Sequence, residues 1–270
     1  MKIYRAMKQL FASAAEHTRI DGIYIGLGYT AVTLEEGSTG IAYTYLEDKK
    51  GCSLVSDPTD YEGRPAVELM EKLESANLVE RSAAIALVNA LNHRRSHAFR
   101  EDQGSLLDDL GVSAGSTVAM AGYFGPVAAL IEQRGARVEA HDIGKEIGEQ
   151  ERFYRLLESG TPAALILTST SVIGGTTEEL LSHLAPATPC ALLGPTTPMI
   201  PEAFTHLPIH ILGGTLPVDR EGVLKAIRHG RGTKAIHRAS KKIYYRAETD
   251  HVPALEGSGT QHLHGGITSE

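Results

Sequence analysis

The stretch Thr117–Asp142, TVAMAGYFGPVAALIEQRGARVEAHD, decides how the chain is interpreted. It opens with a short β-branched and apolar run, Thr117–Ala121, which is followed by the glycine–proline break Gly122–Pro126. Val127–Arg134 then has a helical pattern, and Arg137–Ala140 begins a second strand. A strand–turn–helix–strand unit of this kind opens a parallel sheet, and such a sheet binds small ligands just beyond its strand ends. The stretch therefore predicts where a site lies, although not what it binds.

Short apolar runs and helical segments alternate from Thr117 onward. We expect five strands at Thr117–Ala121, Arg137–Ala140, Ala163–Thr168, Cys190–Leu193 and Ile209–Leu212. The helices expected between them are Val127–Arg134, Gly148–Glu158, Thr177–Leu184 and Arg220–His229. Ile243–Tyr245 is a weaker candidate for a further short strand. This alternation predicts an α/β protein with a Rossmann-like, doubly wound parallel sheet.

The first part of the chain has a different pattern. An amphipathic helix is expected at Ile3–Ala15, and three strands separated by turn residues are expected at Gly22–Gly26, Tyr29–Leu34 and Gly40–Leu46. A loop over Lys49–Arg64 and two helices, from Pro65 to about Ser75 and over Leu78–His97, complete a small α+β lobe.

A polar, glycine-containing segment, Glu101–Ser116, is expected to join the two lobes. We therefore predict an α+β lobe over residues 1–105 and a Rossmann-like domain over residues 106–250. Residues 251–270 are rich in Gly, Ser, Thr and His and lack periodicity, so they are expected to form a flexible tail.

Composition excludes several classes of protein. The formal net charge of −7 argues against sequence-independent binding to nucleic acid or to an anionic membrane. Apolar runs are too short to cross a bilayer. Cys52 and Cys190 lie in unlike contexts, so neither a disulfide framework nor a CxxC site is indicated. We expect a cytoplasmic protein, and homo-oligomerisation is left open.

The loop after the first strand of the parallel sheet partly matches a dinucleotide-binding fingerprint. Asp142 follows Gly122 at the separation typical of a ribose-binding acid. Phe124, however, stands where the fingerprint needs its second glycine, so an aromatic ring replaces the space for a pyrophosphate. A nucleotide-type cofactor, S-adenosylmethionine or NAD, is therefore the alternative hypothesis. Asp142 is equally well explained as a cap of the next segment of the chain.

Two further loops come after expected strands. Thr168-Ser169-Thr170-Ser171 precedes Gly174–Thr177, where Thr176 and Glu179 have the spacing of a capping box. Hydroxyls ahead of a helix are also suited to hold an anion. If the strand order is 2-1-3-4-5, this loop lies beside Gly122. The proline-rich loop Gly194–Pro201 reaches the same edge of the sheet.

Charged segments offer weaker candidates. Arg228–Lys234 contains basic residues and glycines at the end of an expected helix. We favour helix capping over phosphate binding for this segment by odds of about two to one. His93 and His97 share a helical face, but Arg94 and Arg95 between them disfavour a bound cation. The sequence thus offers no convincing set of protein ligands for a metal.

Several segments together resemble a bacterial and archaeal family named for heavy-metal chelation. The matching residues are Ile25–Thr30, Gly40–Thr44, Glu80–Ala90, Gly122–Pro126, Thr168–Thr176, Gly194–Pro198 and Gly230–Thr233. The resemblance implies an enolase N-terminal-like lobe joined to a Rossmann-like lobe, with a ligand site between them. Members of the family often carry Asn before the Gly-Thr pair, whereas Gly174 stands there in this chain.

The leading hypothesis is a protein that binds a small molecule or metal chelate between its lobes, with catalysis left open. Under this hypothesis the sequence does not identify a cofactor, and a divalent or heavy metal ion is the one candidate. As an enzyme, it would use Glu80 or Asp142 as the base. The expected binding residues are Tyr29, Thr30, Thr44, Asn89, Gly122, Phe124, Thr168, Ser169, Thr170, Gly175, Thr176 and Thr196. A non-catalytic metal carrier or scaffold is a third hypothesis.

Overall fold

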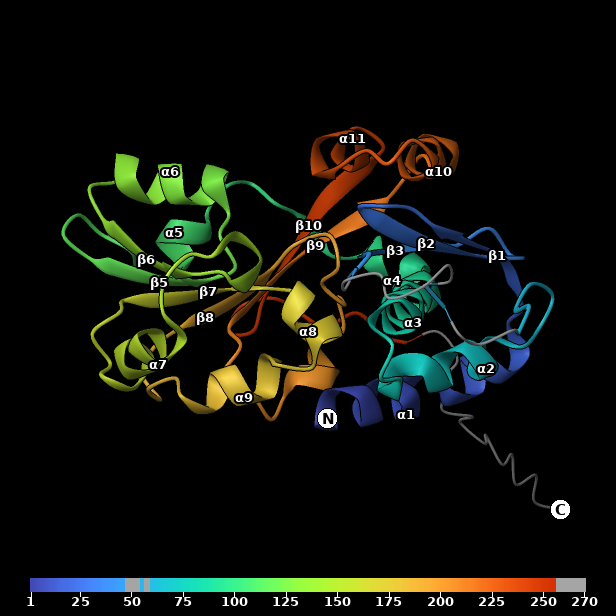
Figure 1. Ribbon diagram of the computed structural model, residues 1–270, viewed down its shortest axis with the longest axis horizontal. Coiled ribbons are helices and arrows are strands. Elements are labelled where there is room, and N and C mark those ends of the chain that lie inside the picture. The colour runs from blue at the N-terminus through green and yellow to red at the C-terminus, as the bar shows by residue number, and fades with distance from the viewer. Residues whose placement is uncertain (47–53, 56–58, 256–270) are drawn as a thin grey trace, which may run out of the picture.

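A seven-stranded sheet forms the larger lobe of the protein in the computed structural model, which describes residues 1–46, 54–55 and 59–255 (Figure 1). Its strands run in the order β4-β10-β9-β8-β7-β5-β6. Their bounds are β4 Arg100–Glu101, β5 Thr117–Ala121, β6 Arg137–His141, β7 Ala164–Thr168, β8 Cys190–Leu193, β9 Ile211–Pro217 and β10 Ser240–Arg246. The five predicted strands are β5 to β9, which pair in parallel, and in chain order they lie as 2-1-3-4-5. The predicted α/β class and Rossmann-like sheet are confirmed.

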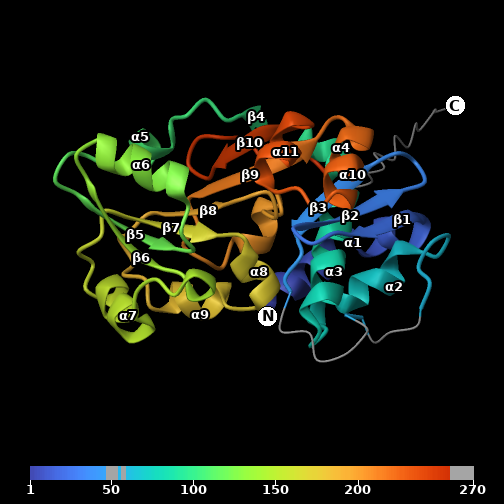
Figure 2. The same ribbon diagram turned by 45° about the horizontal axis from the view of Figure 1, so that its top comes forward.

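Helices cover both faces of this sheet. In Figures 1 and 2, α5 and α6 lie on one face, and α7 and α9 lie on the other. The α6 face is packed by buried residues such as Val118, Met120 and Ile131. The opposite face contributes Ala119, Leu165 and Leu167 to a core that continues into the small lobe. The bounds are α5 Leu106–Asp109, α6 Gly125–Gln133, η2 Ile143–Lys145, α7 Gln150–Glu158, α8 Thr170–Gly174, α9 Thr177–Ser182 and η3 Pro201–Phe204.

The small lobe is a three-stranded antiparallel sheet with helices packed against it, as predicted. Its elements are α1 Lys2–His17, β1 Ile20–Ile25, β2 Tyr29–Leu34, β3 Thr39–Tyr43, α2 Ala66–Met70, η1 Glu71–Glu74, α3 Leu78–Leu91 and α4 His93–Ser96. Every residue of β2 is buried, because α3 packs on one face of the sheet and α10 packs on the other. Two elements from the second half of the chain thus complete the small lobe: α10 Arg220–Arg228 and α11 Thr233–Arg238.

The strand β3 lies very close to α3 at Gly40. A Cβ atom built on Gly40 would lie 2.1 Å from the Ala86 carbonyl oxygen and 2.1 Å from the Ala90 nitrogen. A residue without a side chain is therefore needed where the strand backbone meets the helix backbone. This contact sets the position of β3, and β3 carries residues that reach the larger lobe.

The structure departs from the predicted elements at several points. The single helix expected over Leu78–His97 is two helices, α3 and α4, which are separated at Asn92. The side-chain amide of Asn92 donates to the Met199 carbonyl oxygen over 2.7 Å. The strand β4 begins at Arg100, one residue before the predicted junction, and pairs with β10 of the larger lobe. Residues 251–255 contain neither helix nor strand, and the rest of the expected tail lies outside the described residues, as do parts of the expected loop over Lys49–Arg64. No helix among the described residues combines the length and hydropathy that crossing a bilayer requires.

Candidate functional site

The two lobes meet at Thr196, in the loop after β8. The backbone N–H of Tyr43 donates to the Thr196 hydroxyl oxygen over 2.8 Å. From α3, the side-chain amide of Asn89 donates to the Ile41 and Thr196 carbonyl oxygens over 2.8 and 3.2 Å. Thr196 is 1% exposed, so these bonds are made away from water. The predicted residues Asn89 and Thr196 do come together, and the bonds that they make join the lobes.

Thr30 and Thr44 also lie in this region, but both are fully buried. Their hydroxyl oxygens share a hydrogen bond of 2.9 Å. Because each hydroxyl satisfies the other inside the small lobe, neither is exposed to a ligand. Both residues support the edge of the sheet on which Tyr43 lies.

Three loops of the larger lobe converge at the edge of the sheet, as the strand order requires. Gly122 has a positive φ of 83°, and a Cβ atom on it would lie 2.5 Å from the Thr168 methyl carbon. The N–H of Ser169 donates to the carbonyl oxygen of Leu193, the last residue of β8, over 2.8 Å. The loop after β8 therefore begins beside Ser169. The hydroxyls of Thr168 and Thr170 lie 3.0 Å apart, and both residues are half-buried. This convergence of loops was predicted from the sequence.

The segment after these hydroxyls differs from the prediction. Gly175 ends α8 with a φ of 77°. Thr176 occupies the N-cap position of α9, but its side chain makes no capping hydrogen bond and is exposed. The predicted capping box with Glu179 is therefore wrong. Ser171 and Thr177 share a buried hydrogen bond of 2.8 Å instead, and this bond ties α8 to α9.

Asp142 is a capping residue in this structure. Its carboxylate accepts from the Tyr123 and Lys145 backbone N–H groups over 2.8 and 3.1 Å, and the Lys145 ammonium lies 3.2 Å away. Burial opposes ionisation of Asp142, but the hydrogen bonds from Tyr123 and Lys145 outweigh it and lower the pKa of the carboxyl. Phe124 packs against the core on the α6 face. This arrangement gives no support to a ribose-binding Asp142 or to a pyrophosphate beside Gly122.

Glu80 is buried near the start of α3. It accepts from the Ser75 hydroxyl over 2.7 Å and lies 3.4 Å from the Lys72 ammonium. The neighbouring Arg81, which the sequence did not single out, reaches across to the larger lobe and donates to the Ile173 carbonyl oxygen over 2.7 Å. Both side chains thus make structural contacts, and only Arg81 contacts the larger lobe. No local sequence pattern indicates that Arg81 contacts Ile173, which is 92 residues away.

Three tyrosines line the small-lobe side of the junction. The rings of Tyr29 and Tyr43 are 6.1 Å apart edge to face, and those of Tyr43 and Tyr45 are 6.3 Å apart. Tyr43 is 40% exposed. A Cβ atom on Gly174, at the end of α8, would lie 3.9 Å from the Tyr45 ring. We call Tyr29, Tyr43 and Tyr45 the tyrosine cluster.

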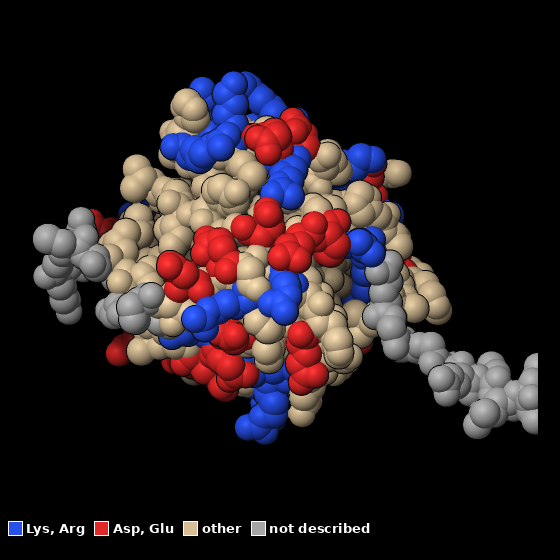
Figure 3. All heavy atoms as spheres, turned by 90° about the vertical axis from the view of Figure 1, so that its right-hand side faces the viewer, with Lys and Arg blue, Asp and Glu red and all other residues tan. Residues whose placement is uncertain are grey.

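The basic segment, Arg228–Lys234, lies against this cluster. The Thr233 hydroxyl is 2.7 Å from the Tyr29 phenol oxygen, and a Cβ atom on Gly230 would lie 3.5 Å from Leu27. Arg231 and Lys234 are exposed, and neither forms an ion pair with any other described residue. Figure 3 shows Lys and Arg side chains gathered at the top of the molecule, where Figure 1 places α10 and α11. The sequence favours helix capping for this segment and does not indicate its proximity to Tyr29.

The described residues contain no group of three or more His, Cys, Asp or Glu side chains that could hold a metal ion. The His93 ring donates to the Pro217 carbonyl oxygen over 2.9 Å, so its Nε2 is already engaged. Cys190 is fully buried, and this burial raises the pKa of its thiol. Hydroxyl and carbonyl oxygens dominate the junction, and they are poor ligands for soft metals.

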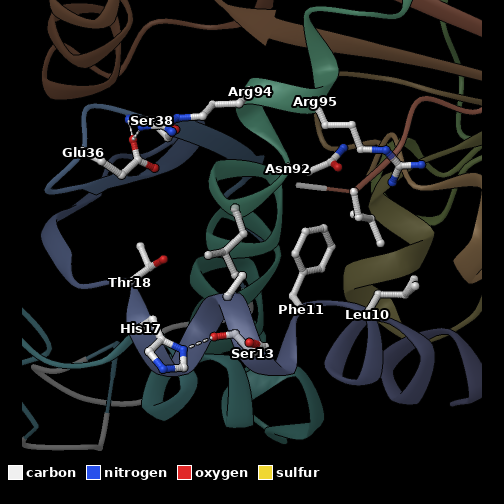
Figure 4. A pocket seen from close by; sticks show the side chains of 13 residues that line it. Leu10, Phe11, Ser13, His17, Thr18, Glu36, Ser38, Asn92, Arg94 and Arg95 are labelled. Carbon is white, nitrogen blue, oxygen red and sulfur yellow. Dashed lines mark hydrogen bonds and ion pairs between the residues drawn. The ribbon is translucent and has the colours of Figure 1, made fainter. Parts of the chain in front are cut away.

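Two surface hollows lie elsewhere. The larger, with a volume of about 530 Å³, is between α1, the α3–α4 turn and the β2–β3 turn (Figure 4). The smaller, of about 240 Å³, lies between β6 and α7. Neither is lined by a residue that the sequence predicted for the site.

The fold and the junction define a two-lobed α/β protein whose Rossmann-like sheet meets a small antiparallel lobe at its loop edge. Family comparison agrees with this class. The model of the DUF364 family, described as "Putative heavy-metal chelation", matches residues 105–246, and that of the DUF4213 family, with the same description, matches residues 8–92. The chain therefore belongs to the DUF364 family, as its resemblance indicated.

Solved structures of the same family share the fold. A protein of unknown function from the DUF364 family of Desulfitobacterium hafniense is 19% identical, with a TM-score of 0.74 over 90% of this chain and 98% of that one. A second, from Pyrococcus horikoshii, is 20% identical, with a TM-score of 0.72 over 91% of this chain and all of the other. No functionally curated protein matches the chain.

Proposed function

We propose that this protein binds a small organic anion that chelates a heavy-metal ion, where the basic segment meets the tyrosine cluster. The observation that carries the proposal is the contact between these two groups: the Thr233 hydroxyl lies 2.7 Å from the Tyr29 phenol, with Arg231 and Lys234 on either side of Thr233 in the chain. The proposal keeps the division into residues 1–105 and 106–250, whose junction forms the site.

The chemistry of these residues suits an anion better than a bare metal. Guanidinium and ammonium groups bind carboxylates and phenolates through charge-assisted hydrogen bonds. Exposed tyrosine rings such as Tyr43 add an apolar surface with a phenol at its end. The description of the family supplies the metal. Among the described residues no three His, Cys, Asp or Glu side chains come together to hold a metal ion, and this favours a metal that arrives already chelated.

Calorimetric titration of the untagged chain tests this proposal with three probes: Ni²⁺ alone, citrate alone and nickel citrate. We expect nickel citrate to bind more tightly than either component, with an affinity that falls as salt is added. The double variant R231Q/K234Q should bind the complex at least about tenfold more weakly, because two charge-assisted contacts are lost.

The matched control is K2Q/R5Q, which removes two exposed cations from α1, at the opposite side of the molecule in Figure 1. It should bind nickel citrate as the wild type does. Equal binding by both double variants would mean that the basic segment does not hold the anion.

A further inference from the structure

The outward side of α10 and α11 carries positive charge that the formal net charge of −7 conceals. From Arg220 to Arg238 the chain has six Lys or Arg residues and one acidic residue. Lys and Arg side chains gather at the top of the molecule in Figure 3, where Figure 1 places these two helices. Four of the cations are exposed and form no ion pair with another described residue, and we call them the basic face: Lys225, Arg231, Lys234 and Arg238.

Two aliphatic side chains of the small lobe are exposed to water beside the basic face. Leu27, in the turn between β1 and β2, is 73% exposed, and Ile25 is 45% exposed. This turn packs closely on the end of α10, because a Cβ atom on Gly26 would lie 2.5 Å from the Ile227 carbonyl oxygen. A Cβ atom on Gly230, which directly precedes a member of the basic face, would lie 3.5 Å from Leu27 Cδ1. The aliphatic side chains and the cations thus form one continuous surface.

This combination of side chains fits an anionic lipid bilayer better than it fits other partners. The cations of a peripheral protein bind anionic headgroups, and its exposed aliphatic side chains are buried among the acyl chains. A nucleic acid would meet the cations with its phosphates, but it would offer Leu27 little apolar surface. A stable protein interface buries roughly 800 Å² per partner around an apolar core. Ile25 and Leu27 supply only a small apolar area among many charges, which favours the bilayer.

We propose that the basic face docks the protein reversibly on a bilayer that contains anionic lipid. Leu27 enters the outer acyl region, and the four cations contact the lipid phosphates. Because charge dominates this contact, docking depends on the content of anionic lipid and weakens as salt screens the charges. The docking surface goes beyond the proposed chelate site: Arg231 and Lys234 are common to both, whereas Lys225 and Arg238 serve docking alone.

Co-sedimentation of the full, untagged chain with sucrose-loaded vesicles tests this proposal. Two vesicle compositions are compared: phosphatidylcholine alone, and equal parts of phosphatidylcholine and phosphatidylglycerol. We expect the protein to sediment with the mixed vesicles, to stay in solution with phosphatidylcholine alone, and to be released from the mixed vesicles as salt is added. A DNA duplex is the third probe, and it should bind more weakly than the mixed vesicles because it does not bury Leu27.

The charge contribution is tested with the double variant K225Q/R238Q, whose matched control is K2Q/R5Q on α1. The variant should bind the mixed vesicles at least about tenfold more weakly than the wild type, because two headgroup contacts are lost, whereas the control should bind them as the wild type does. K225Q/R238Q should still bind nickel citrate as the wild type does, so failure of the docking surface is distinguishable from failure of the chelate site.

The apolar contribution is tested with L27S, whose matched control is L130S at a 54% exposed position of α6. L27S keeps the charge of the basic face and should weaken vesicle binding about tenfold, whereas L130S should leave it unchanged. The proposal is overturned if the wild type binds both vesicle compositions equally or binds neither. It is also overturned if K225Q/R238Q or L27S binds as its control does, or if the DNA duplex binds more tightly than the mixed vesicles.

Discussion

Replacing Gly40 with alanine tests the contact that positions β3. An added Cβ atom would lie 2.1 Å from two backbone atoms of α3, the Ala86 oxygen and the Ala90 nitrogen. Ordinary van der Waals contact begins near 3.4 Å, so strand and helix would have to separate by about 1.3 Å. Backbone atoms have no rotamer that relieves such a clash. We therefore expect G40A to lower the free energy of unfolding by about 3 kcal/mol, the upper end of the usual cost of overpacking.

Urea denaturation followed by circular dichroism measures this change. With a slope of about 3 kcal/mol per molar urea, the midpoint should fall by about 1 M. Gly232→Ala is the control, because its Cβ atom would meet nothing within 4 Å and its φ is −89°. It should shift the midpoint far less than G40A does, because the added methyl group meets no other atom. If G40A shifts the midpoint no more than G232A does, then β3 and α3 do not approach each other as closely as the structure shows.

Three further predictions concern single side chains. Thr196→Val leaves the Tyr43 N–H without its acceptor, so the free energy of unfolding should fall by about 1–2 kcal/mol in urea denaturation, whereas T205V on the surface should change it little. Asp142 has a lowered pKa in the folded state, so it stabilises the fold above the unfolded pKa of about 4, and this contribution is lost as the pH falls through the folded pKa. The difference in stability between wild type and D142N should be about 1 kcal/mol at pH 7 and should shrink below pH 4; a difference that grew on acidification would contradict this sign. Burial raises the pKa of Cys190, so in a C52S background the native protein should not react with Ellman's reagent at pH 8 until it is unfolded, and prompt reaction would show that the thiol is accessible.

Local pattern was sufficient to predict most of the architecture. The alternation of strands and helices after Thr117 identified β5 to β9, and glycine-punctuated runs identified the small antiparallel sheet. The break between α3 and α4 escaped prediction, because neither glycine nor proline marks it at Asn92. The burial of β2 on both faces was likewise invisible, since α10 comes from the far end of the chain.

The candidate site was predictable in its location and less so in its composition. Parallel strands bring their loops to one edge, so the meeting of Gly122, Thr168 and the loop after β8 followed from strand order alone. Strand order does not indicate which hydroxyl groups are free to bind a ligand. The hydroxyls of Thr30 and Thr44 hydrogen-bond to each other, and the Thr196 hydroxyl accepts a hydrogen bond from the Tyr43 N–H. The contact of Tyr29 with Thr233 joins residues 204 apart, and no local signal in the sequence indicates it.

Native mass spectrometry of the untagged chain, purified from its own host, tests the central claim most directly. The claim is that an organic anion brings the metal to the basic segment. We expect a mass increment equal to an organic anion plus a metal ion, and we expect it to be absent from R231Q/K234Q purified in the same way. A chain that carries a metal ion with no organic component, or one whose organic increment persists in that variant, would contradict the claim.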